Sequence, residues 1–149
     1  MSHQAIKITQ ALLAEHVVFH NLFDYLERAT PPLKVLAEVR ALASLLEAML
    51  EVHSTVEDEL LIAPLEPAFS HMGQAENFHG EHDDIKASLK SIRSTRKLAE
   101  GKRLLLKAVL ISRRHFDKEE RIVFPLAEKQ LSAKSLLHLG KRWEDQRKS

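Results

Sequence analysis

Cysteine is absent from this chain of 149 residues. Without it no disulfide, thiolate ligand, iron–sulfur cluster or cysteine-linked haem can form, so a metal site has to use histidine, aspartate and glutamate. Glycine and proline are also scarce, with four and five residues respectively. Together with 44% hydrophobic and 29% charged residues, this composition is typical of a soluble, mostly helical protein with few loops.

A strong excess of charge is missing too, because the formal net charge is +1. Such a balance provides no field that would favour nucleic acid or a membrane surface, and we predict neither as a partner. The chain has no run of about 18 apolar residues and no basic N-terminal segment followed by an apolar one. We therefore predict a cytoplasmic protein, and the length predicts one domain over residues 1–149.

Histidine is abundant, with nine residues, and two of these histidines begin the same short pattern. His53 is followed four residues later by Glu57, and His115 is followed four residues later by Glu119. In a helix this spacing puts the imidazole and the carboxylate on one face. Such a donor pair suits a first-row transition ion such as iron, manganese or zinc better than calcium or magnesium. Two facing helices of this kind could hold two ions.

Apolar residues that recur at alternating steps of three and four predict four long helices and a short fifth one. The long helices are expected over residues 5–29, 33–62, 74–95 and 98–130, and the short one after Ser132, its N-cap. Pro64 and Pro67 are expected to end the second helix, which leaves residues 64–73 as the longest connection. Pro125 is expected to kink the fourth helix near its end.

The two halves of the chain look like copies of one helical hairpin. The His-x-x-x-Glu pattern repeats after 62 residues, and the dipeptides Glu15-His16 and Glu81-His82 repeat after 66. A duplicated hairpin predicts an all-α fold, an up-down four-helix bundle with a short C-terminal fifth helix.

Each of the four long helices carries one histidine on its predicted inner face. Counted from the turns at about 1.5 Å per residue, these histidines fall close to one layer of the bundle, and two glutamates lie beside them. Buried carboxylates without cations would cost several kcal/mol each, and no lysine or arginine occupies an inner position from which to neutralise them. The predicted metal ligands are His16, His53, Glu57, His82, His115 and Glu119.

Two further histidines lie one turn from predicted ligands, His20 beyond His16 and His79 before His82. Each is a candidate for an additional ligand, for a proton donor to a bound small molecule or for a group that supports a ligand. Four acidic residues adjoin the ligands in sequence but point about 100° away around their helices, so they are not expected to chelate the same ion. These are Glu15, Asp58, Glu81 and Glu120. The lone aromatic residue Trp143 is expected to contribute packing only.

The order of one histidine, a His-x-x-x-Glu pair, a second histidine and a second pair, with proline after each pair, resembles the hemerythrin-like HHE cation-binding domain. The resemblance extends over nearly the whole chain. It implies a site of two iron ions with an oxo or hydroxo bridge, in which Glu57 and Glu119 bridge the ions. It also implies that the four histidines are terminal ligands. Manganese and zinc are the alternative metals.

A buried pair of iron ions would bind dioxygen, peroxide or nitric oxide at open coordination positions. We therefore expect a protein that binds, senses or scavenges such a ligand, or handles iron. One alternative is a di-iron enzyme that acts on peroxide or nitric oxide or repairs iron centres, and another is a metal-free helical interaction module. The size of the chain also allows a homodimer. Ferritin-like sites need Glu-x-x-His on two helices and zincins need HExxH, and neither condition is met.

Overall fold

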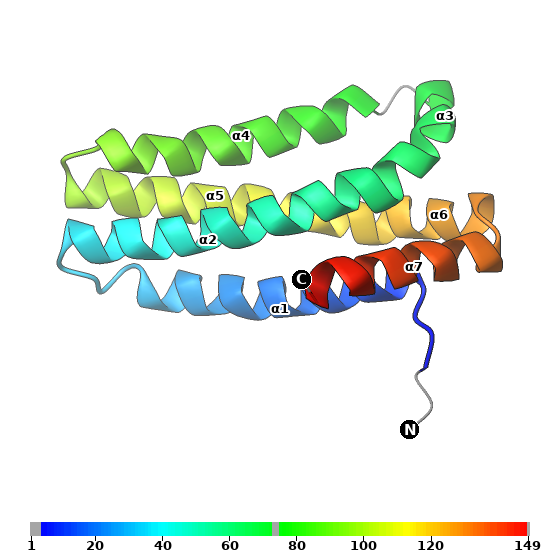
Figure 1. Ribbon diagram of the computed structural model, residues 1–149. Coiled ribbons are helices and arrows are strands. Elements are labelled where there is room, and N and C mark those ends of the chain that lie inside the picture. Colours follow the sequence, from blue (N-terminus) through cyan, green and yellow to red (C-terminus); the bar gives the residue numbers. More distant parts are fainter. Residues whose placement is uncertain (1–3, 73–74, 149) are drawn as a thin grey trace.

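The computed structural model describes residues 4–72 and 75–148, without the side chains of residues 69–72 and 75–80. The elements are α1 Ile8–Ala29, α2 Leu36–Glu57, η1 Asp58–Ile62, α3 Ala63–Met72, α4 Ala75–Ser94, α5 Leu98–Lys118, η2 Glu119–Val123, α6 Phe124–Gln130 and α7 Ala133–Lys148. All are helical, and the described ranges contain no strand, as predicted. Figure 1 shows α1, α2, α4 and α5 lying side by side, while α7 packs against α1. No helix in the described ranges has the length and apolarity needed to cross a membrane.

The chain stays helical through Pro64 and Pro67, so the predicted helix end at Pro64 was wrong, and residues 64–72 of the predicted connection are helical; Gly73 lies outside the described residues. The chain forms the π-helical turn η1 and then α3, which contains Pro67 in its interior. In η1 the N–H of Ala63 bonds to the carbonyl of Asp58, five residues back. This wider turn comes directly before Pro64, whose ring and missing N–H would disturb a regular α-helix.

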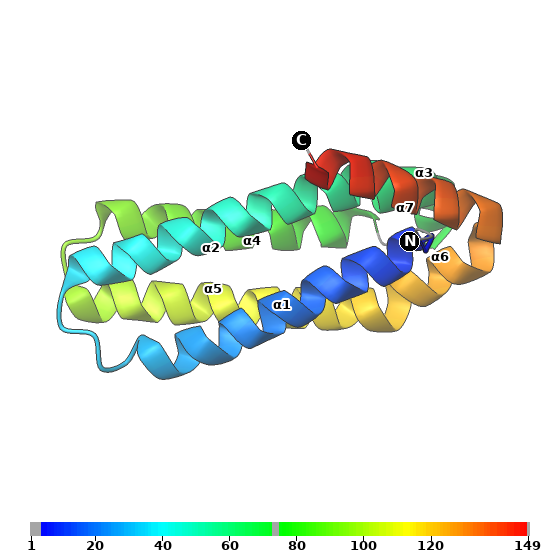
Figure 2. The same cartoon turned by 60° about the horizontal axis from the view of Figure 1, so that its bottom comes forward.

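The fourth helix has a π-helical turn of the same kind before Pro125. Here η2 separates α5 from α6, and the N–H of Phe124, directly before the proline, bonds to the carbonyl of Glu119. Figure 2 shows α6 following α5 without a break but turning away from its direction, so the chain stays helical through Pro125 and the helix bends near its end, as predicted. The turn η1 therefore begins directly after the predicted ligand Glu57, and η2 begins at the predicted ligand Glu119.

Two hydrophobic clusters make up the core, and a polar layer lies between them. In α1, Leu12 belongs to one cluster and Phe19 to the other, and the buried side chain of His16 lies between them. In α2 the clusters follow in the reverse order, first Leu50 and then Val56. The reversal means that α1 and α2 run in opposite directions, and it places the predicted ligands of both helices at the same height.

The last helix packs tightly on the start of the chain. Its Gly140 is buried, and a Cβ atom at this position would lie 1.8 Å from the carbonyl oxygen of Ile6. Leu136 and Leu139 of α7 are buried in the same cluster as Leu12. The predicted cap is confirmed, since the Ser132 hydroxyl accepts a hydrogen bond from the Ser135 N–H at 3.1 Å.

Candidate metal centre

The polar layer contains all six predicted ligands, arranged in two groups that overlap. In the first group, one donor atom from each of four side chains lies within 4.8 Å of all the others, and in the second the same holds for three side chains. The first group is His16, His53, Glu57 and Glu119, and the second is Glu57, His82 and His115. Glu57 belongs to both groups, so its carboxylate lies where it could bridge two ions.

Distances within the groups fit ligands of a common ion. His53 Nε2 lies 3.1 Å from Glu57 Oε2, and His16 Nε2 lies 3.6 Å from both Glu57 Oε2 and Glu119 Oε1. Between the groups, His115 Nε2 of the second lies 3.4 Å from Glu119 Oε1 of the first. Ligands bound at about 2.1 Å, as to zinc, lie about 3.0 to 3.4 Å apart in octahedral or tetrahedral geometry. The observed spacings are close to this range.

Several donor atoms of the layer are buried without a hydrogen-bond partner among the described residues. They are His16 Nε2, Glu57 Oε1 and both carboxylate oxygens of Glu119. The side chains in the first group are at most 2% exposed, and within the described ranges no lysine or arginine pairs with either carboxylate. Each unsatisfied buried group costs about 1–3 kcal/mol. Cations bound between these atoms would remove that cost, so the residues fit a metal pair.

The model of one protein family, the hemerythrin HHE cation binding domain, matches residues 7–133. The chain belongs to this family. Comparison with curated proteins and with solved structures found no significant match. The resemblance drawn from the order of histidines and glutamates is thereby confirmed. The match ends at the first residue of α7, so nearly all of this helix lies beyond the part that defines the hemerythrin domain.

Carboxylates from neighbouring helices orient three of the histidines of this hemerythrin domain. His53 Nδ1 donates to Glu15 at 2.7 Å and His115 Nδ1 donates to Glu81 at 2.8 Å. His16 Nδ1 makes a longer contact of 3.3 Å with Glu120. A proton held on Nδ1 leaves the Nε2 lone pair free to bind a cation, and the carboxylate strengthens that binding.

These carboxylates were missed as functional groups in the sequence. None of them belongs to either donor group among the described residues, but each reaches a histidine on another helix. Glu15 of α1 supports His53 of α2, and Glu81 of α4 supports His115 of α5 in the same way. The repeat of the Glu-His dipeptide was the signal that could have revealed this. By the same repeat, Asp58 corresponds to Glu120.

Cationic or N–H donors hold two of the supporting carboxylates in turn. Glu15 accepts hydrogen bonds from Trp143 Nε1 at 2.8 Å and Arg147 Nε at 2.7 Å, both on α7. Glu81 forms an ion pair with Lys118. Trp143 therefore does more than pack, because it connects α7 through Glu15 to His53, a predicted metal ligand.

The two additional histidine candidates have different outcomes. His20 lies outside both groups, is about one third exposed, and contacts Glu120 through Nε2 at 2.9 Å. Glu120 therefore contacts both His16 and His20, so His20 lies where it could support the carboxylate rather than bind an ion. The side chain of His79 lies outside the described residues, so its role stays a prediction.

An aromatic ring closes one side of the hemerythrin site. Phe116 is buried and stacks on His16, with ring centroids 3.9 Å apart and planes at 7°. It also contacts the ring of His53 at 5.3 Å. No pattern in the sequence indicated this role for Phe116, although the residue directly follows His115. Its ring keeps the imidazoles in place and excludes water from this side of the layer.

His53 and His115 differ in protonation. Burial disfavours the charged form of His53, but the charges and hydrogen bonds of Glu57 and Glu15 outweigh this effect and raise its pKa to about 9. Burial, together with repulsion from His82, lowers the pKa of His115 to about 4. At neutral pH the metal-free protein therefore holds a proton on His53 that a metal ion has to displace, while His115 is already neutral.

The two central carboxyl groups, Glu57 and Glu119, differ in their pKa, so that only one of them is charged. Burial raises the pKa of Glu119 well above its usual value, and the charge of Glu57 adds to the increase. Burial also acts on Glu57, but Glu119, His53 and His16 outweigh it and hold the pKa of Glu57 well below its usual value. In the metal-free protein Glu57 is thus ionised and Glu119 keeps its proton, which a bridging role would require it to release.

Proposed function

We propose that this protein binds two iron ions between its helices, in an up-down four-helix bundle built from a duplicated hairpin. Glu57 and Glu119 would bridge the ions, and His16, His53, His82 and His115 would be terminal ligands. The main support is the pair of donor groups that share Glu57, with buried oxygen and nitrogen atoms that have no other partner among the described residues. Membership of the hemerythrin HHE family supports cation binding independently.

The donor set favours iron over calcium or magnesium. It offers four imidazoles and two carboxylates, whereas calcium and magnesium prefer oxygen ligands alone. Manganese and zinc accept the same donors, so metal analysis has to decide among the three.

The activity we propose is the binding of a small ligand, namely dioxygen, peroxide or nitric oxide, for sensing or scavenging, or the handling of iron itself. An iron pair supplies exchangeable electrons and open coordination positions for such ligands. The second donor group contributes three side chains and the first contributes four, so the second leaves more positions free. Phe116 and the hydrophobic cluster beside it keep bulk water from the first group.

The first test is metal content per chain after expression in iron-supplemented medium, with absorption spectra recorded before and after anaerobic reduction. We expect about two irons and a charge-transfer band between about 300 and 500 nm that bleaches on reduction and returns in air. Zinc alone, or no metal, would refute the di-iron proposal.

A second test addresses the bridging roles. Glu57→Gln and Glu119→Gln each remove a bridging charge and should lose most of the metal. Glu59→Gln is the matched control, because Glu59 lies in η1, is exposed and contacts Arg142. Retention of two ions per chain in both bridging variants would contradict the assigned roles.

A further inference from the structure

A cleft between α2 and α4 leads from the surface to the second donor group. Its volume is about 250 Å³, and its inner end is formed by His82, His115 and Phe116. His82 is half-buried, whereas the ligands of the first group are fully buried. A second cavity, lined by Val52 and His53 among others, includes Glu15, the partner of the outward-facing Nδ1 atom of His53. Of these two openings, the α2–α4 cleft is the one that reaches the coordinating atoms of the second group.

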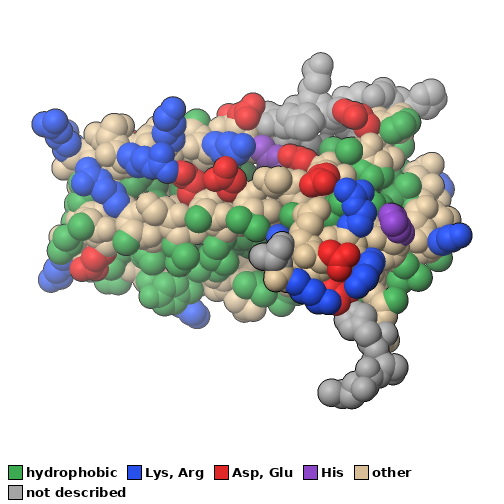
Figure 3. Space-filling view, in the orientation of Figure 1, with side chains coloured by type: hydrophobic (Ala, Val, Ile, Leu, Met, Phe, Trp, Pro, Cys, Tyr) green, Lys and Arg blue, Asp and Glu red, His purple; other side chains and the backbone are tan. Residues whose placement is uncertain are grey.

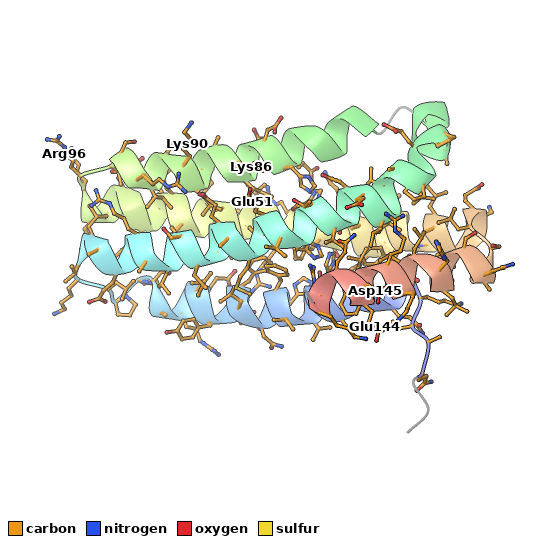
Figure 4. The ribbon with its side chains drawn as sticks, viewed as in Figure 1. Glu51, Lys86, Lys90, Arg96, Glu144 and Asp145 are labelled. Atoms are coloured by element: carbon orange, nitrogen blue, oxygen red, sulfur yellow. The ribbon has the colours of Figure 1, made fainter. Side chains whose placement is uncertain are left out.

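Two lysines lie along this cleft in line with the metal ligand. Lys86 and Lys90 follow His82 at steps of four residues, so all three lie on one face of α4. Both lysines line the cleft, are exposed, and have no ion pair with any residue that the structure describes. Figure 4 shows them on α4, with Glu51 on the facing side of α2. The cleft thus carries positive charge that nothing nearby neutralises completely.

The remaining charges of the cleft do not cancel these lysines. Arg93 is paired with Glu47, which leaves Glu51 as the acidic side chain opposite two lysines. Basic and acidic side chains are both visible along this side of the molecule in Figure 3. The inner part of the cleft is apolar, with Ile85 and Leu89, so a charge that enters it is less screened than at the open surface.

We propose that this cleft is the entrance and binding site for a small anion, attracted by Lys86 and Lys90 and bound at its inner end by the metal ion of the second group. The inference rests on the proposed metal site. The volume supports an anion of several heavy atoms, because a water molecule occupies about 30 Å³ in the liquid and the cleft is about eight times larger. The charge of the two lysines assigns the ligand class as a small anion, and the volume admits one of several atoms.

The test uses azide as the anionic probe and nitric oxide as a neutral probe of similar size on iron-loaded protein. Metal content is measured first in every variant. Lys86→Gln and Lys90→Gln should each slow azide association about threefold at low ionic strength, and the double variant about tenfold, since steering by local charge changes association rates by such factors. Glu51→Gln should speed azide association. Lys34→Gln, an exposed lysine in the turn before α2, is the matched control and should leave the rate unchanged.

Salt and the neutral probe decide whether charge is the cause. The differences between variants should disappear at about 0.5 M salt, where the screening length falls to about 4 Å, and nitric oxide should bind all variants at one rate. The cleft proposal fails, and the metal site stands, if metal is bound but the double variant takes up azide as fast as the unmodified protein. It also fails if the association of nitric oxide slows in the variants as much as that of azide. If no metal is bound, both proposals fail together.

Discussion

Replacement of Glu15 by glutamine tests whether α7 supports the metal site. Glu15 accepts hydrogen bonds from His53 at 2.7 Å, from Trp143 at 2.8 Å and from Arg147 at 2.7 Å. Glutamine keeps the shape of the side chain and one acceptor oxygen, but it loses the charge that strengthens all three bonds. Loss of such a supporting carboxylate lowers metal affinity about 10- to 100-fold, which is about 1.4–2.8 kcal/mol.

Two further variants turn this prediction into a graded series. Trp143→Phe keeps an aromatic ring but removes one of the three donors, so Glu15 stays charged and bound to Arg147. The expected loss of affinity is therefore less than tenfold. Glu59→Gln removes a carboxylate that also contacts α7, through Arg142 at 3.1 Å, but no ion pair joins it to a histidine in the described residues. It should leave the metal affinity unchanged.

The assay is competition between the metal-free protein and a chelator of known affinity, followed by metal analysis of the protein fraction. Circular dichroism before metal addition shows whether each variant is folded. The reasoning would be refuted if Glu15→Gln bound metal as tightly as Glu59→Gln. It would also fail if Trp143→Phe lost as much affinity as Glu15→Gln, since α7 would then act through packing rather than through the carboxylate.

Three other results are expected. Gly140→Ala brings a methyl group against the carbonyl oxygen of Ile6, so it should destabilise the protein by about 1–3 kcal/mol in urea unfolding; unchanged stability would mean that α7 is not held as described. Phe116→Ala should cost about 3–5 kcal/mol in the same assay, because the ring is buried and stacked, and a loss below about 1 kcal/mol would contradict this. The raised pKa of His53, about 9, should stabilise the metal-free protein fully below about pH 6.5, and this contribution should be lost as the pH rises through 9. Metal binding at neutral pH should accordingly release a proton from His53, which calorimetry in buffers of different ionisation enthalpy would detect or exclude.

Local spacing was enough to predict which residues meet in the metal site. The i and i+4 spacing fixes His53 and Glu57 on one face, and hydrophobic periodicity fixes that face toward the core. His16 and His82 were found in the same way, from their place among apolar residues. These features depend on one helix at a time, and helix geometry determines them.

The supporting contacts could not be derived in this way, because they join helices far apart in the sequence. Trp143 and Glu15 are separated by 128 residues, and only the packing of α7 on α1 brings them together. The helix end predicted at Pro64 was wrong because the local pattern did not reveal the π-helical turn. Pro64 and Pro67 usually end a helix, but the wider turn of η1 absorbs the first, and the chain stays helical on both sides.

The duplication is imperfect by one residue beside the metal site. The glutamates are 62 residues apart, but Pro64 and Pro125 are 61 apart, so Glu57 is the last residue of α2 while Glu119 is the first residue of η2. Correspondingly, Glu57 belongs to both donor groups and Glu119 to one. Two ions bound here would be electronically distinct, so an iron-loaded sample should give two quadrupole doublets in its Mössbauer spectrum, and dialysis should remove one ion before the other.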